Sequence, residues 1–412
     1  MNDKSPTTKM KPDATMQLSI VIVSYNVRDY LVQCIDSVLR ATADMEADIW
    51  VVDNASTDGS VEYARSFFPQ VHYIENTENV GFARANNQAI RQSTGKYVLL
   101  LNPDTIVGED AIRGAVDFME VHPKAGATGT QMLNRNGSFA FESRRGLPYP
   151  STAFFKITGL CSLFPRSRFF GHYYMRYLDA TQPAQIEVIS GAYFMLRRTA
   201  LEEAGLLCED YFMYGEDIDL SYTLLQHGWQ NWYQPFRILH YKGESTQKTS
   251  FRYVHSFYDA MLIFFNKHLA KRYRLITLFI KPAVVLRGVL EMIRQQLRRV
   301  IYFFQGLGQA QKPDRLLFIG TDEAWTLMAD ITRRAGMTPI RCTASAAEGG
   351  HLQLPDVART CNYVVYQTEA PATTYARILE LLATGQQQQQ RSHLGTFSLR
   401  TRTIILPNEI IQ

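Results

Sequence analysis

Strand-like and helix-like patterns alternate over the first hundred residues of the chain. Short apolar runs typical of buried strands are followed by segments in which apolar residues recur every three or four positions, as on one face of a helix. Strands separated by helices of this length predict right-handed βαβ units and a parallel sheet. The predicted strands are LSIVIVSYN (18–26), ADIWVVDNAS (47–56), VHYIENT (71–77) and YVLLLNPDT (97–105), and the predicted helices are 29–41, 58–68 and 81–93.

Three of these strands end in polar residues. The clusters SYN, DNAST and NPDT stand at the carboxyl ends of the first, second and fourth strands. In open α/β sheets, ligands bind outside the carboxyl ends of the strands. The polar clusters therefore predict a binding site at this edge of the sheet.

The pattern changes in the middle of the chain. Residues 130–180 are irregular and rich in aromatic residues and arginine, which predicts long loops. Residues 186–205 then indicate a strand, a turn and a helix, and residues 217–227 indicate a further helix. Residues 230–245 form a predicted strand with His240 near its end.

The last third of the chain divides into two parts. A basic region from about residue 256 to 309 is predicted to be helical, and strand and helix patterns restart after residue 312. The glutamines at 386–390 are low-complexity and predict a solvated loop. We therefore predict four segments, which are a disordered lead (1–16), a large α/β domain (17–262), a basic helical segment (263–312) and a small Rossmann-like α/β domain (313–412).

Composition indicates a globular protein with more than one domain. The 412 residues are 46% hydrophobic and 20% charged, and a chain of this length exceeds one compact core. The net charge is only +4, but residues 267–299 hold nine Lys or Arg against the single acid Glu291. Five cysteines lie far apart without a CxxC pair, which favours a reducing compartment over a disulfide framework or a zinc site. The first 17 residues have no apolar core, so we predict no secretory signal there.

The end of the second strand offers a carboxylate, Asp53. One interpretation is structural, with Ser56 or Asp58 capping the next helix and the cluster forming a turn. The other is that Asp53 accepts the N3–H of a pyrimidine base, with Tyr25 packed beside the ring. These residues alone do not decide between the two interpretations.

The fourth strand ends in Asn102 and Asp104, which are separated by a proline. Asn-Pro-Asp is common in turns, and a turn is the first interpretation. Carboxylate and amide oxygens also suit Mg²⁺ or Mn²⁺, which can neutralise a leaving diphosphate. His240 is a candidate third ligand because imidazole suits Mn²⁺ better than Mg²⁺, although a histidine at a strand end can equally be structural.

Three carboxylates, Glu216, Asp217 and Asp219, stand at the start of the helix predicted for 217–227. Acidic residues in a first turn complement the helix dipole, which accounts for Glu216 or Asp219. The preceding residues 211–214 are aromatic or apolar. A carboxylate held against apolar walls has a raised pKa and can act as a general base.

Seven motifs follow one another along the chain, namely SIVIVSYN, VVDNASTDGS, NVGFARANN, LLLNPDT, ISGAYFMLRR, YFMYGEDIDLS and LHYKGEST. In this order they resemble family 2 glycosyltransferases of the GT-A fold, and most of all the rhamnosyltransferase-type members that build bacterial surface polysaccharides. The resemblance covers roughly residues 17–262. It implies a metal-dependent, inverting transferase with Mn²⁺ or Mg²⁺ that uses a nucleotide-diphospho-sugar, dTDP-rhamnose or a UDP-sugar being favoured. The implied acceptor is a growing surface polysaccharide linked to polyprenyl diphosphate.

The resemblance also implies roles for individual residues. Asp217 matches the catalytic base, and Asp104 and His240, with Asn102, match the metal ligands. The residues implied to bind the donor are Tyr25, Asp53, Asn79, Gly81, Asn86, Asn102, Gly191 and Glu216.

Some positions depart from the family's pattern. Asn102 occupies the first acid of the DxD-type metal motif, so Asp104 would dominate metal binding. Cys208 stands where the family usually has Asp, and Thr223 where it often has Arg. These two changes affect local loop geometry but remove no proposed catalytic group. The QxxRW segment of processive synthases is missing, which favours transfer of a single sugar.

The basic segment has two interpretations. Within residues 272–304, the longest uncharged stretches, 275–280 and 282–286, fall well short of the ~20 residues that span a bilayer. A basic amphipathic helix suits an anionic membrane surface, and a lipid-linked acceptor would favour a cytoplasmic enzyme that is peripheral on the inner face of the membrane. The alternative is a set of helices packed on the large domain with a solvated basic face.

Two other functions stay open from the residues alone. A sugar nucleotidyltransferase is also a metal-dependent α/β protein, but it needs a glycine-rich basic loop where this chain has SYNVRDY. A non-catalytic module that binds sugar nucleotides would not need Asp104, Asp217 and His240. The small domain at 313–412 has one glycine where a dinucleotide loop needs GxGxxG, so we expect an interaction or regulatory role there. No nucleic-acid partner is expected.

Overall fold

The structure is a computed structural model that describes residues 16–242, 259–270, 273, 296 and 313–412, except residues 372, 391 and 408. The predictions of a disordered lead, apart from residue 16, and of a basic helical segment, apart from residues 263–270, 273 and 296, therefore concern residues outside the described part.

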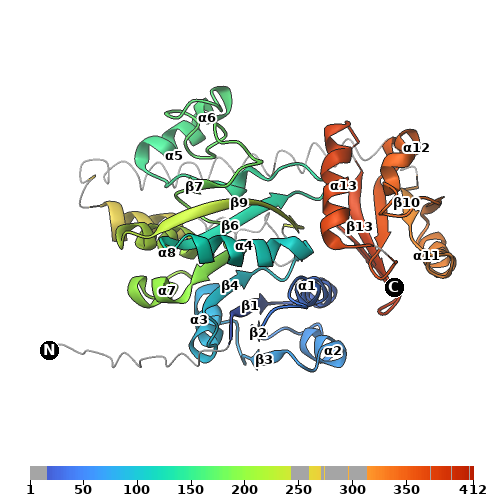
Figure 1. Ribbon diagram of the computed structural model, residues 1–412, viewed down its shortest axis with the longest axis horizontal. Coiled ribbons are helices and arrows are strands. Elements are labelled where there is room, and N and C mark those ends of the chain that lie inside the picture. Colours follow the sequence, from blue (N-terminus) through green and yellow to red (C-terminus); the bar gives the residue numbers. More distant parts are fainter. Residues whose placement is uncertain are drawn as a thin grey trace.

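A nine-stranded mixed sheet forms the centre of the large domain (Figure 1). Its order is β3-β2-β1-β4-β8-β6-β9-β5, and β7 pairs with β9. The four strands β3, β2, β1 and β4 are parallel, as predicted, whereas β8 runs antiparallel to β4 and β5 antiparallel to β9. The strands are β1 (Leu18–Ser24), β2 (Ala47–Asp53), β3 (His72–Glu75), β4 (Tyr97–Leu101), β5 (Thr105–Val107), β6 (Ala125–Leu133), β7 (Ala184–Ile186), β8 (Tyr193–Arg197) and β9 (Gln230–His240).

Helices cover both faces of this sheet because its inner strands are buried on both sides. Along β1, Leu18, Ile20 and Ile22 pack against α1, α2 and α4, while Val21 and Val23 point to the opposite core under α3, α7 and α8. This period of two follows from strand geometry and explains the continuous apolar run. The helices are α1 (Arg28–Ala41), α2 (Ser60–Phe67), α3 (Phe82–Gln92), α4 (Glu109–Val121), η1 (Phe141–Ser143), α5 (Pro150–Ile157), α6 (Leu160–Leu163), α7 (Arg198–Ala204), α8 (Glu216–Gln226) and η2 (Phe265–Leu269).

One strand differs from its predicted place. The segment 186–205 was expected to start as a strand and then turn, but the strand β8 follows the turn at Gly191. Its partners are β4 and β6, and Leu101 of β4 lies opposite Tyr193. The apolar run after the turn is the one buried between these two neighbours.

The C-terminal residues build a second sheet of order β11-β10-β12-β13-β14-β15. Its first four strands are parallel, and β14 and β15 add antiparallel pairs that the sequence did not predict. The glutamine run is only in part the solvated loop that was expected. Gln388 and Gln389 form an exposed turn, but Gln386 and Gln387 end α13 and Gln390 is buried. The elements are β10 (Arg315–Ile319), α11 (Asp322–Arg334), β11 (Thr338–Cys342), η3 (Gly350–Gln353), α12 (Pro355–Thr360), β12 (Tyr363–Gln367), α13 (Tyr375–Gln387), β13 (His393–Ser398), β14 (Thr403–Leu406) and β15 (Glu409–Ile411).

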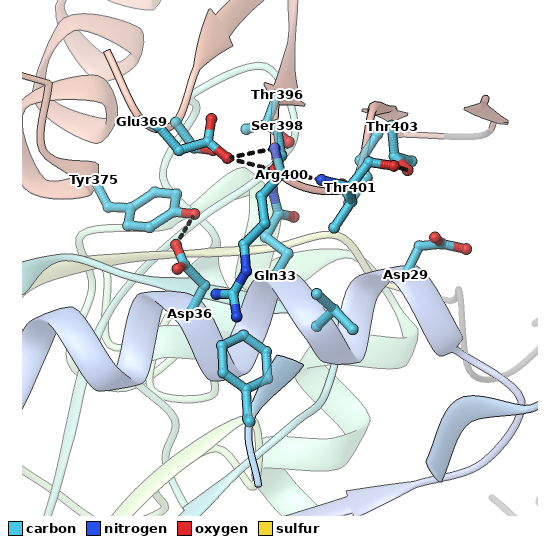
Figure 2. Close-up of a pocket in the computed structure, with 14 residues that line it drawn as sticks. Asp29, Gln33, Asp36, Glu369, Tyr375, Thr396, Ser398, Arg400, Thr401 and Thr403 are labelled. Carbon is cyan, nitrogen blue, oxygen red and sulfur yellow. Dashed lines mark hydrogen bonds between the residues drawn. The ribbon is translucent and has the colours of Figure 1, made fainter. Parts of the chain in front are cut away.

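This second unit packs firmly against α1 and β9 of the large domain (Figure 1). One apolar cluster joins the two, with Tyr30 and Leu239 on one side and Leu379 and Leu382 on the other. Figure 2 shows the polar part of the contact, a cavity of about 140 Å³ in which Tyr375 Oη donates to Asp36 at 3.0 Å. A shared core of this kind holds the two sheets together as one body.

The described start of the basic segment also packs on the large domain. Lys267 Nζ lies 2.9 Å and His268 Nε2 2.6 Å from the buried carboxylate of Asp219 in α8. These contacts correspond to the packed alternative for residues 259–270, and the rest of the segment lies outside the described residues. In the described part of the chain, no helix combines the length and the apolar character needed to cross a bilayer.

Candidate active site

A cavity of about 270 Å³ opens where the strands of the main sheet end. Loops after β1, β2 and β4, the end of β9 and the turn before α8 all contribute side chains to it. The predicted site residues that line it are Tyr25, Asn79, Asn102, Asp104, Gly191, Glu216, Asp217 and His240. Segments far apart in the sequence thus meet at the edge that the polar clusters predicted.

One side of the cavity, here called the strand-end wall, consists of Asn102, Asp104 and His240. The β5–β9 register places Thr105 opposite His240, so Asp104 lies beside the imidazole. His240 Nε2 is 3.2 Å from Asp104 Oδ1 and 3.3 Å from Asn102 Nδ2. The proline turn is also present, because Thr105 Oγ1 donates to Asn102 O at 2.8 Å. The turn and site interpretations of NPD are therefore compatible.

The donor atoms of the strand-end wall fit a divalent metal ion. A carboxylate and an imidazole converge within hydrogen-bonding distance, and Asp104 is almost fully buried. Among the described residues, no cluster of three or more His, Cys, Asp or Glu side chains could hold a metal. The protein would therefore supply few ligands, as is common where substrate phosphates complete the shell of Mg²⁺. Asn102 presents its amide nitrogen to His240, so its oxygen could contribute only after the amide turns over.

The opposite side, here called the helix wall, consists of Arg145, Glu216 and Asp217. Arg145 Nη2 donates to Asp217 Oδ2 at 2.5 Å and to the carbonyl of Ile189 at 3.0 Å. Gly191 N donates to the same Asp217 oxygen at 3.1 Å. The Asp217 side chain, 14% exposed, is thus fixed in an ion pair at the cavity surface.

Glu216 is a different kind of acid from its neighbour. It is only 6% exposed, and its Oε2 has no hydrogen-bond partner within the described residues. Burial raises the pKa of Glu216 to about 8, and the adjacent charge of Asp217 adds to the rise. At neutral pH Glu216 therefore holds its proton, and the raised pKa that the aromatic residues predicted belongs to Glu216.

A left-handed turn delivers these two acids to the cavity. Tyr214 has φ 69° and Gly215 has φ 87°, and Gly215 caps the start of α8. A Cβ at Gly215 would come within 2.9 Å of the Tyr211 ring, so the backbone passes too close for any other residue. A strained conformation kept at a cavity edge is typical of functional sites.

Three predicted donor-binding residues do not line the cavity. Asp53 accepts hydrogen bonds from Ser56 N at 2.8 Å and Ser56 Oγ at 2.6 Å, so its carboxylate closes the turn after β2. Gly81 begins α3 and packs against the backbone of Phe212. Asn86 lies inside α3 and donates to the Phe82 carbonyl at 2.9 Å.

Two cations at the cavity were missed from the sequence. Arg145 comes from the irregular region 130–180, where the only signal was its richness in arginine. Lys242, two residues after His240, donates to Asn134 Oδ1 at 2.6 Å and lies 3.2 Å from Glu142 Oε2. Lys242 places positive charge where an anionic ligand could bind, whereas the charge of Arg145 is paired with Asp217.

Residues 19–205 match the profile described as glycosyl transferase family 2. The chain carries a family 2 glycosyltransferase domain. This confirms the predicted family, the enzyme class and the GT-A-like α/β architecture of the large domain.

Three known glycosyltransferases are similar to this chain in sequence or structure. The chain is 28% identical over 295 residues to an N-acetylglucosaminyl-diphospho-decaprenol L-rhamnosyltransferase of Mycobacterium tuberculosis, covering 68% of this chain and 94% of the relative. It is 27% identical over 222 residues to a low-salt glycan biosynthesis hexosyltransferase of Haloferax volcanii, covering 52% and 64%. A mannosyltransferase from Pyrobaculum calidifontis, solved in complex with GDP-Man and Mn²⁺, overlaps with a TM-score of 0.37 at 19% identity, covering 58% of this chain and 60% of that one.

The residues that match the family profile include only part of the cavity lining. They include Tyr25, Asp104 and Gly191 but stop short of Glu216, Asp217 and His240. The geometry of the glycosyltransferase cavity is therefore what brings the last three residues to the others.

Proposed function

We propose that this glycosyltransferase moves a single sugar from a nucleotide-diphospho-sugar to an acceptor hydroxyl, with inversion at the anomeric carbon and with a divalent metal ion. The observation that carries the proposal is the pairing of two unlike walls across one cavity. A metal-compatible acid and imidazole stand on one side, and a fixed carboxylate stands on the other.

The strand-end wall would bind the donor diphosphate. Asp104 and His240, with a lesser part for Asn102, would hold Mn²⁺ or Mg²⁺. Such an ion, when bound, neutralises charge on the departing nucleoside diphosphate. Lys242 lines the same cavity and would add positive charge near the phosphates. Tyr25 and Asn79 would lie against the nucleoside, and Asp53 and Asn54 would shape the end of β2 beside it.

The helix wall would prepare the acceptor. Asp217 would accept the proton of the acceptor hydroxyl, whose oxygen attacks the anomeric carbon from the face opposite the diphosphate. A single in-line displacement inverts the configuration. Glu216 is less suited to this role because its side chain is buried, and burial raises its pKa and so favours the protonated acid. Gly191 leaves room beside Asp217 for the sugar, since a Cβ there would lie 3.5 Å from the Asp217 Cβ.

The acceptor class is proposed from the relatives. The mycobacterial relative is named for a decaprenyl-diphosphate-linked acceptor and for rhamnose. We therefore propose a saccharide on a polyprenyl diphosphate as acceptor and dTDP-rhamnose or a UDP-sugar as donor. An acceptor of this kind would place the enzyme at the inner face of the cytoplasmic membrane.

A donor screen tests the proposal. Thermal stabilisation of the full chain by UDP-, dTDP- and GDP-sugars is measured with and without Mn²⁺, and release of the nucleoside diphosphate is followed. We expect one base to stabilise the protein more strongly with Mn²⁺ than without it. If no donor stabilises the protein more with Mn²⁺ than without it, the assignment of the strand-end wall as the metal site is contradicted.

A further inference from the structure

Residues 150–177, here called the aromatic segment, project from the large domain above β7, at the top of the view in Figure 1. The segment contains α5, α6 and the turns that follow them. It contains no Asp or Glu, and its Lys and Arg residues are Lys156, Arg166, Arg168 and Arg176. Neither the cavity nor the second sheet uses this part of the chain.

Five phenylalanines of the segment form one continuous cluster. The Phe155 ring lies 5.0 Å from both Phe169 and Phe170, and Phe154 and Phe164 extend the cluster at 5.9 and 5.4 Å. The outer members remain exposed, since Phe154 is 57% and Phe169 65% accessible. A contiguous apolar surface of this kind on a folded domain marks an interaction site.

The exposed apolar surface also includes aliphatic side chains. Ile157 follows Phe154 by one helical turn on α5 and is 55% exposed, and Leu163 at the end of α6 is 68% exposed. Residues three apart share a helix face, so Phe154 and Ile157 present one apolar stripe.

The Lys and Arg side chains of the segment itself face no acid from within residues 150–177. Arg166, Arg168 and Arg176 are exposed and lie within a few residues of Phe164 and Phe169. Arg176 lies over the Phe141 ring at 4.2 Å, so a guanidinium flanks the apolar face rather than facing a carboxylate. Exposed aromatic side chains and cations, in a segment that itself contains no acid, match an anionic lipid surface in both polarity and charge.

The aromatic segment is anchored at Glu187, next to the residue that pairs with Arg145 of the helix wall. Arg145, which precedes it, bridges to Val188, and Leu147 N donates to Glu187 Oε2 at 2.6 Å. His172 within the segment contacts the same Glu187 oxygen at 3.0 Å. A surface bound at the tip would therefore lie on the side of the molecule where Arg145 holds Asp217.

We propose that the aromatic segment docks on an anionic phospholipid bilayer, with Phe154, Phe164 and Phe169 entering the interface and Arg166 and Arg168 meeting lipid phosphates. This inference rests on the proposed function to the extent that a lipid-linked acceptor gives the docking its purpose. An anionic bilayer offers headgroups that bind the arginines and an apolar layer that accepts the phenylalanine rings. The aromatic segment exposes both kinds of side chain on one surface.

Hydrogen–deuterium exchange of the full chain tests the proposal. The probes are vesicles of phosphatidylcholine with 30% phosphatidylglycerol and vesicles of phosphatidylcholine alone. We expect peptides from residues 150–177 to become protected only with the anionic vesicles. Protection confined to peptides from the basic segment 263–312 would overturn the proposal.

Two variants make the same test by co-sedimentation. Phe164→Ser/Phe169→Ser and Arg166→Gln/Arg168→Gln should each lower partitioning onto anionic vesicles by about tenfold or more. The matched control is Arg333→Gln/Arg334→Gln, which removes two exposed cations from the last turn of α11 and should leave partitioning unchanged. Equal partitioning of all three variants would overturn the proposal, as would conversion of a dimer into a monomer by the Phe substitutions without any vesicle binding.

The outcome is separable from that of the proposed function. Metal-dependent release of nucleoside diphosphate in the absence of vesicles should be the same for the wild type and both variants. Loss of vesicle binding with intact release supports docking, whereas absence of release from the wild type would refute the proposed function and leave the exchange result standing.

Discussion

The two walls of the cavity are built in different ways. The strand-end wall takes its residues from the ends of β4 and β9, and the β5–β9 register alone brings Asp104 beside His240. The helix wall instead depends on one ion pair between Arg145 and Asp217, which are 72 residues apart, and on a left-handed turn at Tyr214 and Gly215.

The residues of the strand-end wall are thus positioned by the backbone, whereas Asp217 in the helix wall is positioned by the side chain of Arg145. Strand ends are held by backbone hydrogen bonds between strands. A substitution in the strand-end wall should therefore remove a metal-binding side chain without moving the neighbouring residues. The helix wall is held by polar contacts of Arg145, so a substitution there should disturb geometry as well as charge. The predictions below test that difference.

The largest effect is expected from Asp104→Asn. The substitution removes the one carboxylate of the strand-end wall, so Mn²⁺ should no longer strengthen donor binding and transfer should fall by about 10³-fold or more. Thermal shift with a Mn²⁺ titration and an assay of sugar transfer check both results.

Asn102→Ala is the matched control for Asp104→Asn. Its amide nitrogen faces His240, so the metal response should largely persist. A metal response that disappears in Asn102→Ala but survives in Asp104→Asn would reverse the roles assigned to the two residues.

A smaller effect is expected from Arg145→Gln. The Asp217 carboxylate would lose its ion pair and its fixed orientation, so kcat should fall by about 10–100-fold while the KM for the donor stays unchanged. Arg145→Lys should recover part of kcat because it keeps the charge. If instead KM rises and kcat is retained, Arg145 binds the donor phosphates rather than positioning Asp217.

Glu216→Gln should change the pH dependence of stability. The folded pKa of about 8 lies above that of an unfolded glutamate, so the native state binds the proton more tightly. That stabilisation is complete below the unfolded pKa and is lost as the pH rises through 8. Glutamine cannot ionise, so the free energy of unfolding of the variant should rise relative to that of the wild type as the pH rises, by on the order of a few kcal/mol at pH 9.

Urea denaturation between pH 5 and 9 measures this difference. Glu120→Gln is a suitable control, because the hydrogen bond from Lys96 lowers the pKa of Glu120. The free energy of unfolding of this variant should therefore not rise relative to the wild type between pH 5 and 9. Parallel curves for Glu216→Gln and the wild type would show that Glu216 is ionised in the native state at these pH values.

The smallest effect is expected away from both walls. Tyr375→Phe removes the hydrogen bond to Asp36 across the contact between the two sheets and should cost about 1 kcal/mol of unfolding free energy. Transfer should not change, and Tyr363→Phe is a matched control on β12. Loss of transfer in Tyr375→Phe would give the second sheet a role in the reaction.

The sequence predicted the strand-end wall better than the helix wall for physical reasons. Asp104 and His240 each follow an apolar run, and parallel strands carry such ends to one edge. Arg145 follows no periodic element, and its partner is far away in the chain, so no local pattern could identify it. Aromatic neighbours did predict a raised pKa near the acids, but only the three-dimensional burial shows that Glu216 carries it.

Errors in the fold have a similar origin. The strand near Gly191 was placed before the turn because both flanking runs are apolar, and only pairing with β4 and β6 selects Tyr193–Arg197. The glutamine run was expected to be a solvated loop from its composition. Gln388 and Gln389 are exposed, yet α13 continues to Gln387 and Gln390 is buried. Tertiary contacts decided both cases.

Asp217→Asn gives the most direct test of two walls with separate tasks. The same purified variant is assayed for Mn²⁺-dependent donor binding by thermal shift and for sugar transfer to a saccharide acceptor. Donor binding should match the wild type, and transfer should fall by about 10²–10⁴-fold because the proton acceptor is lost. Transfer at the wild-type rate in Asp217→Asn would contradict the account.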